Sequence, residues 1–197
     1  MTYPLPSFER VLVIGTTTDY IDFIDRRYPH RAIFVTDPAE RLRGKEKSPD
    51  PSSEILVALE HPLTVFEEIR AHLTRHGLKP SGVACFDCES MYLSSLIARE
   101  FGLPYPSSEA ILAGRSKFIS KERWQRAGLD CPVGEQIEQS QEAADFRRRH
   151  NGKLVIKPLT GSGSELIFIC TTDEACSDAL ETMRRRLEAI PKARMYD

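Results

Sequence analysis

Short apolar runs alternate with helix-like segments over the first half of the chain. Four runs have the length of a single strand: residues 10–15, 31–36, 54–59 and 82–86. Helical spacing of apolar side chains follows three of them, over residues 20–28, 62–76 and 89–101. Strands that are apolar on both faces and joined by helices are typical of a parallel sheet covered on both sides. We therefore expect an α/β fold with a Rossmann-like parallel-sheet domain over residues 1–106, in which the polar stretch 41–53 is a loop.

The pattern changes after the segment Pro104-Tyr105-Pro106. Two helices are expected next, over residues 108–114 and 116–127, followed by a short strand over 133–137 and a charged helix over 141–150. Two closely linked strands, 153–157 and 165–170, and a last helix, 172–189, complete the order. Two strands joined by a small-residue loop indicate an α+β unit rather than more parallel sheet. The sequence thus predicts a helical linker over residues 107–132 and a small α+β subdomain over residues 133–197.

Charge and composition exclude several classes of protein. Lys and Arg number 27 against 29 Asp and Glu, so the net charge is −2, whereas nucleic-acid binders normally carry a strong basic excess. No apolar stretch approaches the length of a membrane span, and the N-terminus lacks the basic and apolar regions of a secretory signal. Five cysteines without a dense framework fit a reducing compartment. We therefore expect a cytoplasmic protein with no nucleic-acid and no membrane partner.

A lysine beside a small-residue loop is the most informative local feature. Lys157 ends the apolar run 154–156, and the loop Gly161, Ser162, Gly163 and Ser164 follows it. Successive backbone N–H groups in such a loop can form an anion-binding concavity, and glycine lets a phosphate approach closely. The loop is not a Walker A motif, because no Gly-Lys-Ser/Thr follows the glycines. The alternative that stays open is a solvent-exposed hairpin with a lysine on its edge.

A second lysine lies forty residues earlier. Lys117 follows Arg115 and Ser116 at the start of a predicted helix. Two cations, one opening a helix and one on a strand beside a glycine loop, could converge on one phosphate chain. Taken alone, Lys117 has the pattern of an ordinary solvated helix lysine.

Taken in order, these segments resemble the ATP-grasp superfamily, which includes biotin carboxylase, carbamoyl phosphate synthetase and D-alanine–D-alanine ligase. Enzymes of this family carry an N-terminal Rossmann-like pre-ATP-grasp domain before the segments in question. The motifs that carry the resemblance are Ser116-Lys117, Ala127-Gly128-Leu129-Asp130-Cys131-Pro132, Val155-Ile156-Lys157-Pro158, Gly161-Ser162-Gly163-Ser164 and Leu166-Ile167-Phe168-Ile169. The resemblance covers nearly the whole chain.

The resemblance implies roles for these residues. Lys117 and Lys157 would contact the ATP phosphates or the nearby adenine edge, and Arg115 is a lesser candidate. The loop of Gly161, Ser162, Gly163 and Ser164 would close over the phosphates. Ser116 stands where the family often has Asp, which departs from the family pattern but leaves the lysine in place.

The resemblance also implies what this chain lacks. Family members carry a second subdomain that supplies the Mg²⁺ ligands and the substrate-binding arginines, and no matching segment follows residue 189. No metal ligand is therefore expected here, and Mg²⁺ is expected only for the full enzyme. The implied function is the ATP-binding half of a carboxylate–amine or carboxylate–thiol ligase that works through an acylphosphate and is inactive as this chain alone. Expected partners are ATP, a small carboxylate, a C-terminal half or companion subunit, and a second copy of the chain in a homodimer.

Other residue patterns leave alternatives open. A non-catalytic α/β interaction or small-ligand-binding module is one, and a thiol-redox protein acting through Cys85 and Cys88 is another. His72 and His76 stand four apart on a predicted helix, and solvated side chains are expected there rather than metal ligands. The threonines at 16–18 are expected to cap a helix, with small-anion binding as the alternative.

Overall fold

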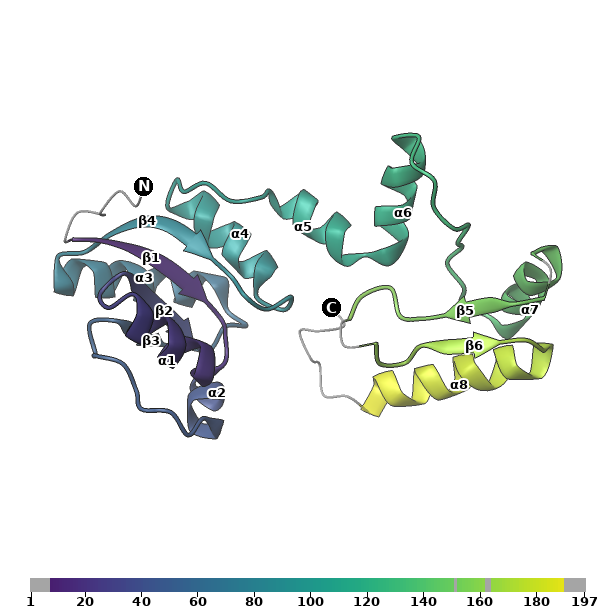
Figure 1. The fold of residues 1–197 in the computed structure, drawn as a ribbon, viewed down its shortest axis with the longest axis horizontal. Coiled ribbons are helices and arrows are strands. Elements are labelled where there is room, and N and C mark those ends of the chain that lie inside the picture. The colour runs from purple at the N-terminus through teal and green to yellow at the C-terminus, as the bar shows by residue number, and fades with distance from the viewer. Residues whose placement is uncertain (1–7, 151, 162–163, 190–197) are drawn as a thin grey trace. The chain divides into compact units, whose positions relative to one another are not determined.

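The computed structural model describes residues 8–150, 152–161 and 164–189. The chain divides into two compact units, residues 1–111 and residues 112–197 (Figure 1). The boundaries expected from the sequence, at 106 and 132, stay predictions. None of the helices in the described ranges is both long enough and apolar enough to cross a membrane.

A parallel sheet forms the centre of the first unit. Its strands are β1 (Glu9–Ile14), β2 (Ala32–Thr36), β3 (Glu54–Leu56) and β4 (Lys79–Ala84). They lie in the order β3-β2-β1-β4, and every neighbouring pair is parallel. The predicted α/β fold with a parallel sheet is therefore confirmed.

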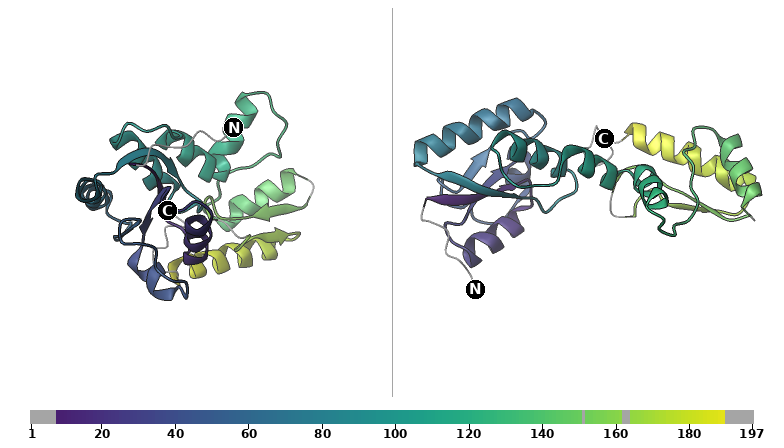
Figure 2. Two further views of the ribbon diagram at one scale, coloured as in Figure 1. Left: turned by 60° about the vertical axis from the view of Figure 1, so that its left-hand side comes forward. Right: turned by 90° about the horizontal axis from the view of Figure 1, so that it is seen from above.

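Helices cover both faces of this sheet, as Figure 2 shows. The helices are α1 (Thr18–Arg27), α2 (Pro38–Arg43), α3 (Pro62–His76) and α4 (Met91–Glu100). On one face Leu12 and Ile33 pack in a cluster with Ile69 of α3 and Ile97 of α4. On the other face Val13 and Phe34 pack against Ile21 of α1. Alternate residues of one strand enter opposite cores, which explains why the strands are apolar throughout.

The helix α2 overlaps the segment that was expected to be a loop, and the expectation for residues 41–43 is wrong. The Asp37 side chain accepts a hydrogen bond from the Ala39 N–H at 2.8 Å, and Pro38 occupies the first helical position. Both are standard signals for a helix start. Arg41 then pairs with the buried Glu54 carboxylate of β3, which fixes this short helix against the sheet edge.

His72 is buried rather than solvated, so the expectation for this residue is also wrong. Its side chain lies on the inner face of α3 and is only 5% exposed. Its Nε2 lies 2.9 Å from the carbonyl oxygen of Ser52, which joins α3 to the loop before β3. A buried polar side chain needs such a hydrogen-bond partner. The helical spacing of apolar residues in the sequence does not reveal a partner that lies twenty residues away.

The second unit contains one small antiparallel sheet and its helices. The elements are α5 (Ser108–Arg115, which spans the unit boundary), α6 (Lys117–Arg126), α7 (Ser140–Arg149), β5 (Leu154–Ile156), β6 (Phe168–Cys170) and α8 (Asp173–Ala189). The strands β5 and β6 pair antiparallel, and α7 and α8 pack on one face of the pair. Leu154 and Ile156 enter this core together with Leu180 and Met183 of α8.

The strand expected over residues 133–137 is absent, because this segment has no regular secondary structure. Side chains hold it instead of a strand ladder. The Lys121 ammonium donates to the carbonyl of Val133 at 3.4 Å, and Glu135 forms a two-pronged ion pair with Arg149 of α7 at 2.9 and 3.0 Å. Val133 and Ile137 at the two ends of the segment were therefore an insufficient signal for a strand.

Candidate functional site

Lys157 follows β5 on the open face of the small sheet. Neighbouring side chains of a strand point to opposite faces, so burying Leu154 and Ile156 turns Val155 and Lys157 outward. Val155 is 54% exposed, and Lys157 is exposed as well. The pattern that buries the core thus places the lysine on the open face.

Lys117 begins α6 and contacts the segment that follows Lys157. The Ser116 side chain caps the helix by accepting a hydrogen bond from the Ile119 N–H at 3.2 Å. The Lys117 ammonium donates to the carbonyls of Thr160 and Gly161, each at 3.1 Å. Two lysines forty residues apart in sequence are thereby brought to the same place.

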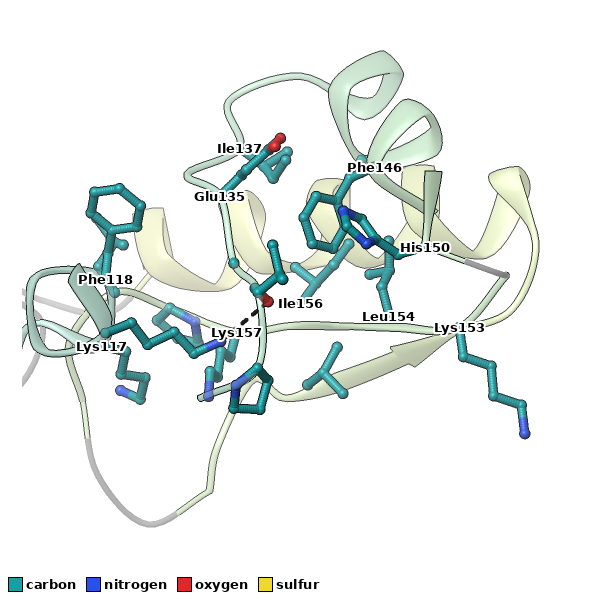
Figure 3. Close-up of a pocket in the computed structure, with 18 of the residues that line it drawn as sticks. Lys117, Phe118, Glu135, Ile137, Phe146, His150, Lys153, Leu154, Ile156 and Lys157 are labelled. Atoms are coloured by element: carbon teal, nitrogen blue, oxygen red, sulfur yellow. Dashed lines mark hydrogen bonds between the residues drawn. The ribbon is translucent and has the colours of Figure 1, made fainter. Parts of the chain in front are cut away.

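Both lysines line one pocket of about 680 Å³. Its walls come from α6, the irregular segment 132–137, α7 and residues 153–159. Figure 3 shows Lys117 and Lys157 toward one end of the pocket and Phe146 and His150 of α7 toward the other. A pocket of this size falls within the range of small-molecule sites.

The lysine end of the pocket is positively charged without an acidic counterpart. Partial burial and the neighbouring charge of Lys157 lower the pKa of Lys117. Within the described ranges, neither lysine forms an ion pair with a carboxylate. Glu135, the acid of the pocket wall, is already paired with Arg149. Two adjacent ammonium groups without a carboxylate favour binding of an anion between them.

The other predicted site residues are placed differently. Gly161 has a φ of +97°, a left-handed conformation that glycine adopts at little cost, and it accepts the bond from Lys117. Ser164 is exposed with a φ of +60°. Ser162 and Gly163 lie outside the described residues. Arg115 ends α5 and does not line the pocket.

Aromatic side chains of the pocket were missed at the sequence level. Phe118 and Trp124 line it from α6, and Phe146 of α7 and His150, the C-cap residue of that helix, also line it. The rings of Phe146 and His150 lie in contact, with centroids 4.4 Å apart. Their spacing of four residues on one helix was a usable signal, but nothing local showed that α6 and α7 share a pocket. The site therefore combines a cationic end with an aromatic and apolar wall.

The threonines after β1 do not present a free anion site. The hydroxyl of Thr18 donates to the Glu46 carboxylate, and the hydroxyl of Thr17 donates to the Asp19 carboxylate. Thr17 is the N-cap residue of α1, but its side chain makes no capping hydrogen bond, so the expected capping role is wrong for it. Acidic side chains of the chain itself occupy these donors.

The cysteine pair after β4 is poorly suited to nucleophilic chemistry. Burial and the nearby Asp87 raise the pKa of the Cys85 thiol to about 11. The Cys85 thiol donates to the Asp87 carbonyl at 3.1 Å. Because the thiolate is the reactive form, a thiol held this far from ionisation does not favour the redox alternative.

Within the described ranges, no three His, Cys, Asp or Glu side chains are grouped so as to hold a metal ion. The residues around the lysine pair therefore do not fit Mg²⁺ on their own.

Comparison with known proteins gives matches in structure but not in sequence. No family model matches the chain, and no curated protein matches it in sequence. An L-amino acid ligase from Bacillus licheniformis superposes with a TM-score of 0.60 at 16% identity, over 89% of this chain and 42% of the ligase. An N5-carboxyaminoimidazole synthase from Aspergillus clavatus, solved with ADP and 5-aminoimidazole ribonucleotide, superposes with a TM-score of 0.60 at 18% identity, over 90% and 45% of the two chains.

A third match is the biotin carboxylase domain of a 2-oxoglutarate carboxylase from Hydrogenobacter thermophilus, solved with ADP, its magnesium salt and bicarbonate. It superposes with a TM-score of 0.58 at 16% identity, over 91% of this chain and 40% of that domain. The chain thus spans less than half the length of each of these enzymes. At such low identity the likeness establishes the fold. The chain therefore has the fold of ATP-grasp enzymes over the part of their length that it spans.

Proposed function

We propose that this chain binds ATP in the pocket between α6, α7 and β5, with Lys117 and Lys157 on the phosphates. The observation that carries the proposal is the pair of ammonium groups at one end of a pocket that offers them no carboxylate. A polyphosphate carries several negative charges in a row, which two neighbouring cations neutralise better than one.

The rest of the pocket supports a ligand with an apolar ring at its other end. Beyond the lysines the wall carries Ile137, Phe146 and His150, and Leu154 and Val155 come from β5. Flat aromatic and aliphatic surfaces suit a planar heterocycle such as adenine. Charge at one end and apolar surface at the other match the two ends of a nucleotide.

We further propose that the chain is the ATP-binding part of a carboxylate–amine or carboxylate–thiol ligase. In this reaction a carboxylate oxygen attacks the γ-phosphorus of ATP, which gives an acylphosphate and ADP. The amine or thiol then attacks the acyl carbon, the C–O bond to phosphate breaks, and inorganic phosphate leaves. The fold shared with ATP-grasp enzymes supports this class of reaction, and two of the matched enzymes were solved with ADP.

Turnover would require more than the described residues provide. Phosphoryl transfer depends on metal ions and positioned charge at the transferring group. No metal-binding group is present among the described residues, and the matched enzymes are more than twice as long as the aligned portion. We therefore propose that the chain works with a C-terminal half or a companion subunit, in a cytoplasmic protein that also forms homodimers, and that Mg²⁺ binds with that missing part.

ATP titration of the chain tests the site, because its single tryptophan, Trp124, lines the pocket and reports binding by fluorescence. Lys157→Met should weaken ATP binding about tenfold or more, since it removes one charge-assisted contact of about 1.5–3 kcal/mol. The matched control is Lys79→Met, because Lys79 is an exposed lysine of the first unit and does not line the pocket. Equal affinities of wild type and Lys157→Met, or equal losses in both variants, would contradict the site assignment.

A further inference from the structure

The two lysines of the site are held in different ways. The Lys117 ammonium donates to the carbonyls of Thr160 and Gly161, and its backbone N–H donates to the carbonyl of Leu159 at 2.9 Å. One residue thus contacts three consecutive carbonyls of the segment 159–161. Lys157 is exposed and makes no hydrogen bond or ion pair with the rest of the described chain.

One of these three contacts uses a donor that the helix leaves unpaired, and the other two use the side-chain ammonium. Lys117 is the first residue of α6, and backbone N–H groups in the first turn of a helix have no partner within the helix. The Leu159 carbonyl fills that need for Lys117. An ammonium has three N–H donors, of which two are taken by Thr160 and Gly161. The third donor is left for a ligand, so Lys117 can hold the segment and contact an anion at the same time.

The contacts of Lys117 also make the position of residues 159–161 depend on the positive charge of the two lysines. Partial burial and the charge of Lys157 lower the pKa of Lys117, so the two ammonium groups disfavour each other while no anion is bound. The carbonyl oxygens of Thr160 and Gly161 offset part of that repulsion. An anion between the lysines would offset the remainder and strengthen the charged form of Lys117, which is the form that holds the carbonyls.

We propose that Lys117 is a positioning residue that ties the segment 159–161 to the start of α6, so that a polyphosphate at the lysine pair also fixes this segment. The inference rests on the proposed function and adds a division of labour to it. Lys157 acts through its charge alone. Lys117 acts through its charge and through the tetrahedral arrangement of its donors, which a planar guanidinium does not reproduce.

The tie is tested first without nucleotide, by hydrogen exchange of the Lys117 backbone amide measured by NMR. Lys117→Met should accelerate exchange of the residue 117 amide about tenfold, after correction for its intrinsic rate, since the loss of about 1.4 kcal/mol in protection corresponds to that factor. The control is Lys121→Met, because Lys121 also donates to a carbonyl within the pocket but contacts Val133 instead. Unchanged exchange in Lys117→Met, or equal acceleration in both variants, overturns the tie.

The division of labour is tested with arginine at each position. Lys157→Arg keeps the charge and should weaken ATP binding by no more than about threefold, whereas Lys117→Arg should weaken it about tenfold or more. If Lys117→Met folds poorly, Lys117→Arg is the second variant for the exchange experiment. It retains the charge, and it is also expected to accelerate hydrogen exchange of the residue 117 amide. Equal effects of arginine at the two positions overturn the division of labour.

The coupling is tested by adding ATP to the wild-type chain, which should slow exchange of the Lys117 amide about tenfold. ATP binding without any change at this amide overturns the inference and leaves the proposed function standing. If the wild-type chain does not bind ATP, both the proposed function and the proposed effect of ATP on residues 159–161 are wrong. Whether Lys117 holds this segment without nucleotide is decided separately, by the exchange rates measured in the absence of ATP.

Discussion

His72 shows how a single buried side chain makes this protein sensitive to pH. Its Nε2 lies 2.9 Å from the Ser52 carbonyl, which can only accept, so the neutral ring carries its proton on Nε2. Burial lowers the pKa of His72, and the nearby charges of His76 and Arg75 act in the same direction. Protonation would add a second proton to the ring and so place a positive charge on a residue that is only 5% exposed. The folded state therefore favours neutral His72.

Stability should consequently fall as the medium becomes acidic. In the unfolded chain His72 takes up a proton near its ordinary pKa of about 6.5, whereas the folded chain resists protonation until a lower pH. The contribution of His72 is thus fully present above about pH 6.5 and decreases below it. His72→Gln keeps an N–H donor but cannot titrate, so its free energy of unfolding in urea should fall less between pH 7 and pH 5 than that of wild type.

The exposed His61 provides the control, and His61→Gln should show the pH dependence of wild type. If His72→Gln and wild type lose the same free energy of unfolding over this pH range, the proposed role of His72 is wrong.

At the scale of elements, the turns that leave β1 and β4 meet at one glycine. Gly15 has a φ of +55°, and a Cβ on it would collide with the Ser90 Oγ and lie 2.8 Å from an Asp87 carboxylate oxygen. The Ser90 hydroxyl in turn donates to Asp87 at 3.1 Å. The turn from β1 to α1 can approach the turn from β4 to α4 only because residue 15 has no side chain.

Gly15→Ala should lower the free energy of unfolding by about 3 kcal/mol, because it combines an unfavourable backbone conformation with a collision in a packed region. The matched control is Gly77→Ala at the end of α3. Gly77 has a nearly equal φ of +60° with open space around it. The control should lose only about 1 kcal/mol, from the backbone conformation alone. Equal losses in urea denaturation would show that the two turns do not depend on this close approach.

At the scale of the whole molecule, the candidate site belongs entirely to one unit. Every residue that lines the pocket lies between 117 and 159, and the second unit spans residues 112–197. The core beneath the site is built from α7, α8, β5 and β6 of that unit. The first unit has separate cores on the two faces of its own sheet. Folding of the site therefore depends on contacts within the second unit.

Residues 112–197 expressed alone should accordingly fold and bind ATP with an affinity within about threefold of the whole chain, because the same buried core supports the same pocket. The measurement is the dispersion of amide signals by NMR together with the ATP-dependent fluorescence of Trp124. The fragment carrying Lys157→Met is the control for specific binding. A fragment that is unfolded, or that is folded but no longer binds ATP when the whole chain does, would contradict this prediction.

Local sequence patterns predicted the architecture because they report burial on a single element. The apolar runs and helical spacings anticipated the parallel sheet and α3 over residues 62–76, and the Lys157 motif singled out a residue that lines the candidate pocket. The same patterns failed for α2, for the segment 133–137 and for His72. In each case contacts from distant residues decided the outcome: Arg41 with Glu54, Glu135 with Arg149, and His72 with Ser52.

Local patterns in the sequence predicted most of the strands and helices, α2 and the segment 133–137 excepted, and they singled out Lys157 beside a small-residue loop and Lys117 at a helix start. These follow from side-chain periodicity and from residue type, which act over a few neighbouring positions. The packing of the second unit, which no local pattern showed, brings Lys117 against residues 159–161, places the two lysines in one pocket, and lines that pocket with aromatic rings of α6 and α7. Such contacts join residues far apart in the chain, and their energies depend on the packing of the whole unit rather than on any local pattern.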